Sequence, residues 1–311
     1  MLRKTVLVIC GPTASGKSAL AAEAAHVLNG VVLNCDSMQI YKDIPVIAAA
    51  PTQAEKELAE HRLFEIYDCA KRGNVVEWLD LCVAEIRKLW AENRLPVVAG
   101  GTGFYAEALL NGVTPIPETP AEIRKKMRQR LSEDGLEQLY AVLREKDAVT
   151  AGKLHANDKT RIVRALEIIE ATGRKVSDWY KEPLLQKLPE AEFKIIKIMP
   201  PLDIIAERCC LRLDKMVYEQ KALEEIKKLR ARGLDAALPA MKALGVPELN
   251  QYLDGQMSLD EAVTLAKLHT RQYAKRQRTW LKNKIKADIV FENVYQGQKD
   301  YLQQIFNVIK L

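Results

Sequence analysis

The chain has 311 residues, which is long enough for one large domain with an insertion or for two domains. Hydrophobic residues make up 48% of it, which excludes a disordered chain and allows a sizeable buried core. Lysine and arginine number 47 against 41 acidic residues, and the resulting charge of +6 is compatible with a polyanionic partner without requiring one.

The first hundred residues alternate between strand-like and helical segments. Residues 5–10 form an apolar, β-branched run, an Ala-rich helical segment covers 17–28, and a second apolar run covers 31–35. Apolar positions at helical spacing mark residues 75–93, and a third strand is expected at 95–99. This alternation predicts an α/β fold, with a parallel sheet flanked by helices on both faces and ligands at the carboxyl ends of its strands.

The composition changes after residue 112. Three prolines within 113–120 indicate a linker, and residues 121–182 are rich in charge and helical in pattern. A strand at 193–199 resumes the sheet, and most of the remaining chain is helical. We therefore expect a catalytic core with basic C-terminal helices in residues 1–114 and 191–311, and a helical insertion domain in residues 115–190.

The six cysteines show no C-x-x-C spacing, so a zinc site is not expected. No apolar segment has the length that spans a membrane, and the first residues run directly into a strand instead of forming a signal peptide. These features predict a cytoplasmic protein with reduced thiols and no membrane partner.

A phosphate-binding pattern, G-x-x-x-x-G-K-[ST], lies between the first strand and the first helix. It consists of Gly11, Pro12, Thr13, Ala14, Ser15, Gly16, Lys17 and Ser18. Backbone N–H groups of such a loop hold a phosphate, Lys17 adds a positive charge, and the Ser18 hydroxyl is a candidate ligand for Mg²⁺. The pattern predicts a P-loop NTPase-like sheet but does not identify the phosphate compound, so a kinase or another NTPase remains open.

Asp36 follows the second strand and is expected to face the phosphate loop. It is a candidate for holding Mg²⁺ through water or for accepting a proton from a substrate amine or hydroxyl, while a helix N-cap is the structural alternative. Gln39 offers a donor and an acceptor that suit an adenine edge. Thr102, in a glycine turn after the third strand, is either a ligand for phosphate or a buried threonine of a tight turn.

Basic residues dominate the last long helix, which should begin at a capping box of residues 258–261. From Lys267 to Lys286 no acidic residue interrupts them, so the helix either tracks a phosphate backbone or is simply a solvated surface. Two arginine pairs also share helix faces. Arg161 and Arg164 would grip RNA or pair with Asp158 and Glu167, and Arg208 and Arg212 would clamp a diphosphate or pair with Glu207 or Asp214.

Together these motifs resemble the tRNA dimethylallyltransferase family of the bacterial type. The segments that carry the resemblance are GPTASGKSALA, DSMQIY, AGGTGFYAEAL, NDKTRIVRALEIIEATGR, LDIIAERCCLRLDKM, MKALGVPEL and HTRQYAKRQRTWLK. They cover the chain from Val6 to about Lys284. The sequence departs from the family pattern at residues 46–51, which lack a cation, at Glu60–Leu63, at Thr160, and at residues 218–221, which lack a glycine.

The resemblance implies transfer of a dimethylallyl group from dimethylallyl diphosphate to N6 of the adenosine 3′-adjacent to the anticodon, with release of diphosphate. It implies catalytic roles for Asp36, Thr102 and Lys17, Mg²⁺ as cofactor, and the tRNA anticodon stem-loop as partner of a monomer. Residues that it assigns to tRNA are Asp36, Ser37, Met38, Gln39, Thr102, Arg124, Thr160, Arg161, Arg164, Lys275, Arg276 and Gln277. The alternatives are a P-loop kinase or NTPase, a prenyltransferase acting on free adenine nucleotides, and a non-catalytic RNA-binding protein.

Overall fold

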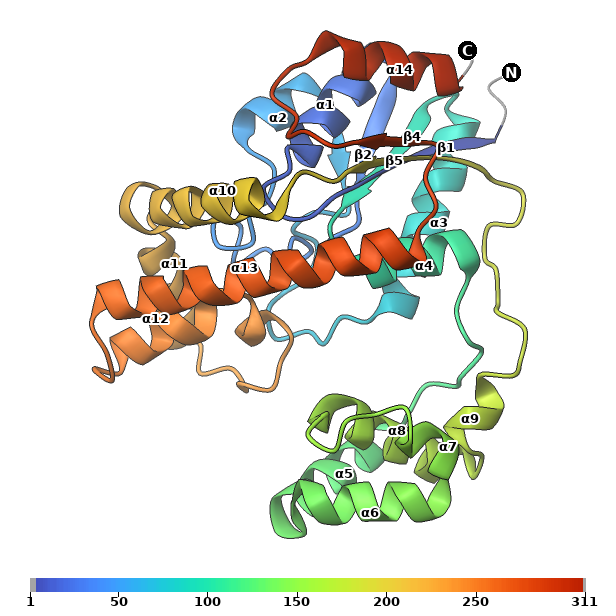
Figure 1. Cartoon of the computed structure of the whole chain (residues 1–311), viewed down its shortest axis with the longest axis vertical. Helices are drawn as coiled ribbons and strands as arrows, with labels where there is room; N and C mark the ends of the chain where they lie inside the picture. Colours follow the sequence, from blue (N-terminus) through green and yellow to red (C-terminus); the bar gives the residue numbers. More distant parts are fainter. Residues whose placement is uncertain (1–3, 310–311) are drawn as a thin grey trace. The chain divides into compact units, whose positions relative to one another are not determined.

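The computed structural model describes residues 4–309, so residues 1–3 and 310–311 of the expected core lie outside the described part of the chain. The chain divides into two compact units, one of Met1–Leu110 with Lys187–Leu311 and one of Asn111–Gln186. The smaller unit begins at 111 where 115 was expected, and ends at 186 where 190 was expected. In Figure 1 it is the green to yellow helical part.

The larger unit is built on a single parallel sheet. Among residues 4–309, its strand order is β3–β2–β4–β1–β5–β6, and every neighbouring pair is parallel. This result confirms the α/β fold expected from the alternating segments. The strands are β1 (Thr5–Cys10), β2 (Gly30–Asn34), β3 (His61–Arg62), β4 (Leu95–Gly100), β5 (Glu192–Ile198) and β6 (Ile289–Phe291).

Helices cover both faces of this sheet (Figure 1). On one face lie α1 (Lys17–Val27), α2 (Gln53–Leu58) and α14 (Lys299–Ile309), and on the other lie α3 (Val75–Ala91) and α4 (Gly103–Asn111). Leu20 of α1 and Ile305 of α14 pack on Leu7 and Ile9 of β1 in one apolar core. Burial of both sheet faces explains why β1, β2 and β4 are continuous apolar runs without alternation.

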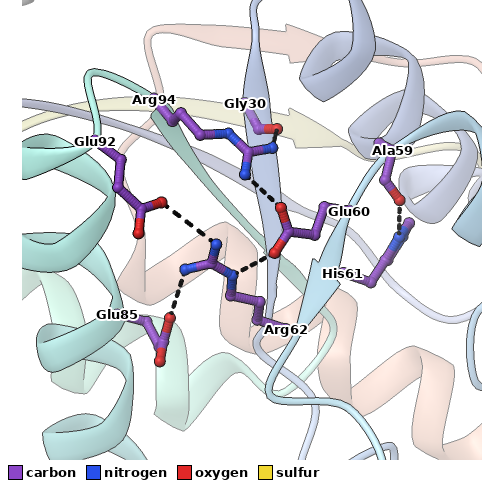
Figure 2. A network of polar contacts seen from close by, with 8 residues as sticks. All are labelled: Gly30, Ala59, Glu60, His61, Arg62, Glu85, Glu92 and Arg94. Carbon is purple, nitrogen blue, oxygen red and sulfur yellow. Dashed lines mark hydrogen bonds and ion pairs between the residues drawn. The ribbon is translucent and has the colours of Figure 1, made fainter.

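The two-residue edge strand β3 is held by charged side chains (Figure 2). Arg62 donates to Glu60, Glu85 and Glu92 at 2.7, 2.9 and 3.4 Å, and so connects the strand to α3. Arg94 donates to Glu60 and to the Gly30 carbonyl at the start of β2. Two paired backbone positions would hold so short a strand weakly, and the ion pairs add to that hold. The bond from Arg94 to the Gly30 carbonyl also ties this network to β2.

A second helical layer follows β5. It comprises α10 (Leu202–Asp214), the π-helical turn η1 (Lys215–Glu219), α11 (Ala222–Ala231), the 3-10 turn η2 (Ala240–Lys242), α12 (Val246–Leu253) and α13 (Leu259–Lys284). The predicted capping box is confirmed, since the Ser258 hydroxyl accepts the Glu261 N–H while the Glu261 carboxylate accepts the Ser258 N–H. The 26 residues of α13 pack against both α10 and α12.

The smaller unit is a helical bundle with its own core. Its helices are α5 (Ala121–Glu133), α6 (Gly135–Lys146), α7 (Ala148–Ala151), α8 (Lys159–Thr172) and α9 (Val176–Trp179). Met127, Leu139 and Leu166 meet in its buried centre. Across residues 4–309, no helix has the length and apolar character needed to cross a membrane.

Candidate active site

The phosphate loop joins β1 to α1 as expected. Because α1 begins at Lys17, the unpaired N–H groups of its first turn lie beside the loop, where they favour an anion. Gly16 has a φ of 88°, and a Cβ atom there would lie 2.4 Å from the Tyr295 carbonyl oxygen. Only glycine fits this position, so the turn that places Lys17 depends on it.

Asn34 shapes the chain at the end of β2. Its Oδ1 accepts the Asp36 N–H at 2.8 Å, and its amide donates to the carbonyls of Asp36 and Leu63 at 3.0 and 3.1 Å. The Asp36 carboxylate in turn accepts the Met38 N–H at 2.9 Å. No helix begins within residues 37–49, so the alternative in which Asp36 caps a helix is wrong. Asp36 instead forms an Asx-type turn.

The glycine turn after β4 closes on the end of β2. A Cβ atom at Gly100 would lie 2.0 Å from the Cys35 carbonyl oxygen, so glycine is required for the approach. Thr102 Oγ1 accepts the Ser37 N–H at 3.0 Å and lies 3.3 Å from the Ser37 hydroxyl, to which it donates. Thr102 therefore lies beside Asp36, as expected, and holds the turn that carries it.

Gln277 of α13 connects the phosphate loop to the glycine turn. Its Oε1 accepts the Thr13 N–H at 2.9 Å, and its Nε2 donates to the Gly101 carbonyl at 2.8 Å. The side chain is buried, and both ends of its amide bind protein atoms. Contact between Gln277 and tRNA stays a prediction, and the hydrogen bonds give it a role in positioning the two loops.

Two arginines of α10 bind the phosphate loop itself. Arg208 Nε donates to the Ala14 carbonyl at 3.0 Å, and the Arg212 guanidinium donates to the Thr13 hydroxyl. No ion pair joins either arginine to Glu207 or Asp214 in the described residues; Asp214 pairs with Lys267 at 2.6 Å. The ion-pair alternative for these arginines is therefore wrong, and their guanidinium groups lie at the predicted anion site.

A cavity of about 280 Å³ collects most of these groups. The predicted site residues that line it are Thr13, Lys17, Ser18, Asp36, Ser37, Met38, Gln39, Arg212, Arg276 and Gln277. Thr102, Arg208 and Lys275 do not line it. The remaining lining is largely apolar and includes Ile47, Ala48, Ala49, Leu213 and Met216. The cavity thus has a charged end at the loop and an apolar wall.

The electrostatics of this cavity favour an anion. Burial lowers the pKa of Lys17 below its usual range, the Asp36 carboxylate opposes that shift, and Arg212 adds to it. Burial also lowers the pKa of Arg212. Because both buried cations are more stable as charged groups beside an anion, a bound diphosphate would relieve this desolvation. The Ser18 hydroxyl and the Asp36 carboxylate supply oxygen donors to the same cavity, so the residues present fit Mg²⁺.

The family of the chain follows from comparison with known proteins. The family model described as IPP transferase matches residues 39–284. The chain belongs to the IPP transferase family. Named relatives in this family include the tRNA dimethylallyltransferases of a Bradyrhizobium species, 44% identical over 91% of this chain and 92% of theirs, and of Zymomonas mobilis, 38% identical over 93% of each chain.

Solved structures agree with this membership. The tRNA isopentenylpyrophosphate transferase of Bacillus halodurans superposes with a TM-score of 0.69 at 30% identity, covering 99% of this chain and 96% of its own. A eukaryotic dimethylallyltransferase acting on tRNA gives a TM-score of 0.80 at 28% identity, covering 97% and 77%. These likenesses confirm the fold and show an enzyme of the prenyltransferase class.

Three of the four predicted tRNA contacts in the insertion are engaged within that unit. Arg161 Nε lies 3.2 Å from Asp158 Oδ2, and Arg164 donates to Thr119 and Glu167 at 2.6 and 3.3 Å. Arg124 lies 3.8 Å from Glu118. Thr160 lines a small pocket with Arg161 and Arg164. Their contact with tRNA stays a prediction, because partly exposed ion pairs exchange readily for phosphate.

The predicted basic helix is only partly free. Lys267 pairs with Asp214, and Arg278 Nε donates to the Pro200 carbonyl at 3.2 Å. Lys275 and Arg276 are exposed, and the Arg276 guanidinium lies 5.8 Å from the centre of the Tyr273 ring. Some basic residues of α13 therefore hold the helix to the rest of its unit, and others are exposed cations near the cavity.

Tyr273 is a site residue that sequence reasoning missed. It lines the cavity, and burial raises the pKa of its hydroxyl, with the nearby Asp36 charge acting in the same direction. Hydrogen bonds with Thr102 and Gln277 oppose that shift. Its position on the buried face of α13, four residues before Gln277, was the signal that could have identified it.

Proposed function

We propose that the chain transfers a dimethylallyl group from dimethylallyl diphosphate to N6 of the adenosine 3′-adjacent to the anticodon in tRNA. The names of its relatives support the reaction class and the tRNA substrate. The observation that carries the proposal is that Lys17, Arg212 and Asp36 line one cavity. Two cations that can hold a diphosphate and a carboxylate that can accept a proton on one cavity support this transfer.

The diphosphate lies at the charged end, bound by the loop N–H groups, Lys17 and Arg212. The N6 amine attacks C1 of the prenyl group, the C1–O bond breaks, and its electron pair leaves with the diphosphate. Asp36 accepts the proton that N6 loses. Lys17 and Arg212 stabilise the negative charge that develops on the leaving oxygen. Ser18 would hold Mg²⁺, which would supply further positive charge at the diphosphate.

The target adenine leaves its stack in the RNA before it reacts, since N6 of a stacked adenine is out of reach of a carboxylate that lines a cavity. Ser37, Met38, Gln39 and Arg276 line the cavity and would contact the flipped nucleotide, whereas Thr102 acts by holding the turn of Asp36. Arg124, Thr160, Arg161, Arg164 and Lys275 would bind the anticodon stem-loop from outside the cavity. We further propose that the enzyme acts as a monomer in the cytoplasm.

The test is incubation of the protein with radiolabelled dimethylallyl diphosphate and Mg²⁺, in parallel with unmodified tRNA, with AMP and with ATP alone. Label in the tRNA, located by nuclease digestion to the adenosine after the anticodon, is the expected result. Label in AMP with none in tRNA would replace the proposal by a prenyltransferase for free nucleotides. ATP hydrolysis without prenyl transfer would identify a kinase or NTPase.

A further inference from the structure

Part of the apolar wall of the cavity belongs to a turn at residues 45–50. The Ala48 N–H donates to the carbonyl of Ile44, just before the turn, and the Ala50 N–H donates to the Pro45 carbonyl, at 3.0 and 2.9 Å. One side of the turn supplies Ile47, Ala48 and Ala49 to the cavity. No residue from 44 to 51 carries a charge, so the surface that the turn offers is hydrocarbon.

The first N–H groups of this turn point at a carboxylate from α11. Glu225 Oε2 accepts the Val46 N–H at 2.8 Å, and Glu225 Oε1 accepts the Ile47 N–H at 2.9 Å. The two consecutive N–H groups have no partner inside the turn, because they begin it. A carboxylate more than 170 positions away in sequence therefore caps the turn with both oxygens.

The opposite end of the turn is held by Gln39. Its Nε2 donates to the carbonyls of Ala48 and Ala49 at 3.3 and 2.6 Å. Gly245 packs closely against the Ile47 side chain, since a Cβ atom at Gly245 would lie 2.6 Å from Ile47 Cδ1. Glu225 is thus one of three supports, and its removal should shift the turn without unfolding it.

The turn also lines a second cavity. This cavity has a volume of about 780 Å³, and Pro45, Val46 and Ala50 contribute to its lining. Lys17, Ser18, Ala49, Arg212 and Met216 line both cavities. Of these five residues, Ala49 and Met216 are apolar, and they line both cavities together with the phosphate-binding groups. These two residues, with Ile47 and Ala48, offer apolar surface to a short hydrocarbon attached to a diphosphate bound at the loop.

We propose that Glu225 is a positioning residue that fixes the wall at residues 45–50 and thereby sets the length of prenyl chain that the cavity accepts. This inference rests on the proposed function for its substrate, but not for the geometry of the turn. With Glu225 in place, the wall is rigid and fits a five-carbon group. Without it the wall yields, so that the donor binds less well and a longer chain enters more easily.

The experiment compares Glu225→Gln and Glu225→Ala with Glu224→Gln. Glu224 is an exposed neighbour on α11 that pairs with Lys227 at 2.8 Å on the surface, which makes it a matched control. Glutamine retains one acceptor oxygen but places an NH₂ group against the second N–H. Steady-state kinetics with tRNA would be measured for dimethylallyl diphosphate and for geranyl diphosphate, which is five carbons longer.

For both Glu225 variants we expect KM for dimethylallyl diphosphate to rise about tenfold with kcat within about threefold, since Lys17 and Asp36 stay in place. The preference in kcat/KM for the five-carbon over the ten-carbon donor should fall about tenfold, within the range that apolar pocket contacts discriminate. Kinetics and preference equal to those of Glu224→Gln would overturn the proposal, as would a loss confined to kcat.

Hydrogen–deuterium exchange provides a readout that does not depend on activity. The amides of Val46 and Ile47 should exchange at least tenfold faster in Glu225→Gln than in wild type, while peptides of the sheet are unchanged. Unchanged protection at these amides would show that Glu225 does not hold the turn. If wild-type protein transfers no prenyl group, the proposed function fails, and the exchange result still decides the role of Glu225.

Discussion

Asp36 uses one carboxylate oxygen to accept the Met38 N–H, and it lines the cavity beside Lys17. The Asp36→Asn variant keeps that hydrogen bond, because an amide oxygen accepts as a carboxylate does, but it cannot take the proton from N6. We predict a melting temperature and tRNA affinity close to wild type, with kcat lower by about 10²–10⁴, the range for a positioned base. Single-turnover kinetics and thermal unfolding would measure the two effects.

Mg²⁺ concentration separates the base from a metal ligand at this position. If Asp36 acts through bound Mg²⁺, raising the concentration of Mg²⁺ should partly restore the kcat of Asp36→Asn. If it acts as the base, added Mg²⁺ should leave kcat unchanged. Wild-type turnover by Asp36→Asn would exclude both roles.

Lys17 lies buried in the same cavity, and burial lowers its pKa. Lys17→Ala removes the charge that we propose for the diphosphate site, together with a desolvated ammonium that costs folding free energy. We predict that prenyl transfer falls by about 10²–10³, the scale of one lost electrostatic contact to a developing charge, without loss of thermal stability. Isothermal titration with dimethylallyl diphosphate should show weakened binding; near-normal turnover would exclude the phosphate-loop assignment.

At the scale of elements, the link between η1 and α11 carries a conformational strain. Lys221, at the N-terminal end of α11, has a φ of 62°, in the left-handed region that favours glycine. The family pattern has a glycine near this position, and residues 218–221 here contain none. The π-helical turn that precedes it positions Met216 on the cavity wall, so the strain lies beside the site.

Lys221→Gly should therefore stabilise the protein. Relief of the left-handed penalty, about 1–2 kcal/mol, exceeds the added flexibility of glycine in the unfolded chain, so we predict a gain of about 0.5–1 kcal/mol. Thermal unfolding should show a rise of about 1–3 °C. Lys228→Gly, at an exposed position inside α11, is the control and should lower stability by about 1 kcal/mol. Equal changes in the two variants would contradict the argument.

The elements show how far the sequence could be read. Long buried strands and helices were predictable, because β1 is a continuous apolar run and the capping box of Ser258 and Glu261 marks the start of α13. The two-residue strand β3 was not, since two residues show no periodicity and Arg62 depends on ion pairs with the distant Glu85 and Glu92. Its placement is a tertiary effect.

The same division holds in the site. Lys17, Ser18 and Asp36 were predictable, because motif spacing and the ends of parallel strands fix where they lie. The sequence predicts Gln277 as an RNA contact, but its side chain is buried between two loops, and no sequence motif points to Glu225. Both act on backbone groups far away in sequence, and such long-range hydrogen bonds leave no local pattern.

At the scale of the whole molecule, the net charge of +6 is modest, so binding of a polyanion depends on where cations are exposed. Arg161 is 69% exposed and pairs with its neighbour Asp158 across one helix turn, at 3.2 Å. Such a pair contributes little and opens readily when a phosphate competes for the guanidinium. The insertion thus has an exposed cation whose ion pair adds little to the stability of the fold.

Arg161→Ala with Arg164→Ala should therefore weaken tRNA binding and flatten its dependence on salt. Each lost phosphate contact removes about 0.7–0.9 from the slope of log K against log salt, so the slope should fall by up to about 1.8.

Arg164 also donates to Thr119, so Arg161→Ala alone serves as the variant that leaves every contact of Thr119 in place. Arg130→Ala, which removes an ion pair with Asp134 on the same unit, is the control for general loss of charge. Filter binding from 50 to 200 mM salt would measure the slopes, and affinity for dimethylallyl diphosphate should not change. If the double variant and Arg130→Ala give the same slope, the arginines of α8 do not contact tRNA, and the charge of the insertion acts only through its total.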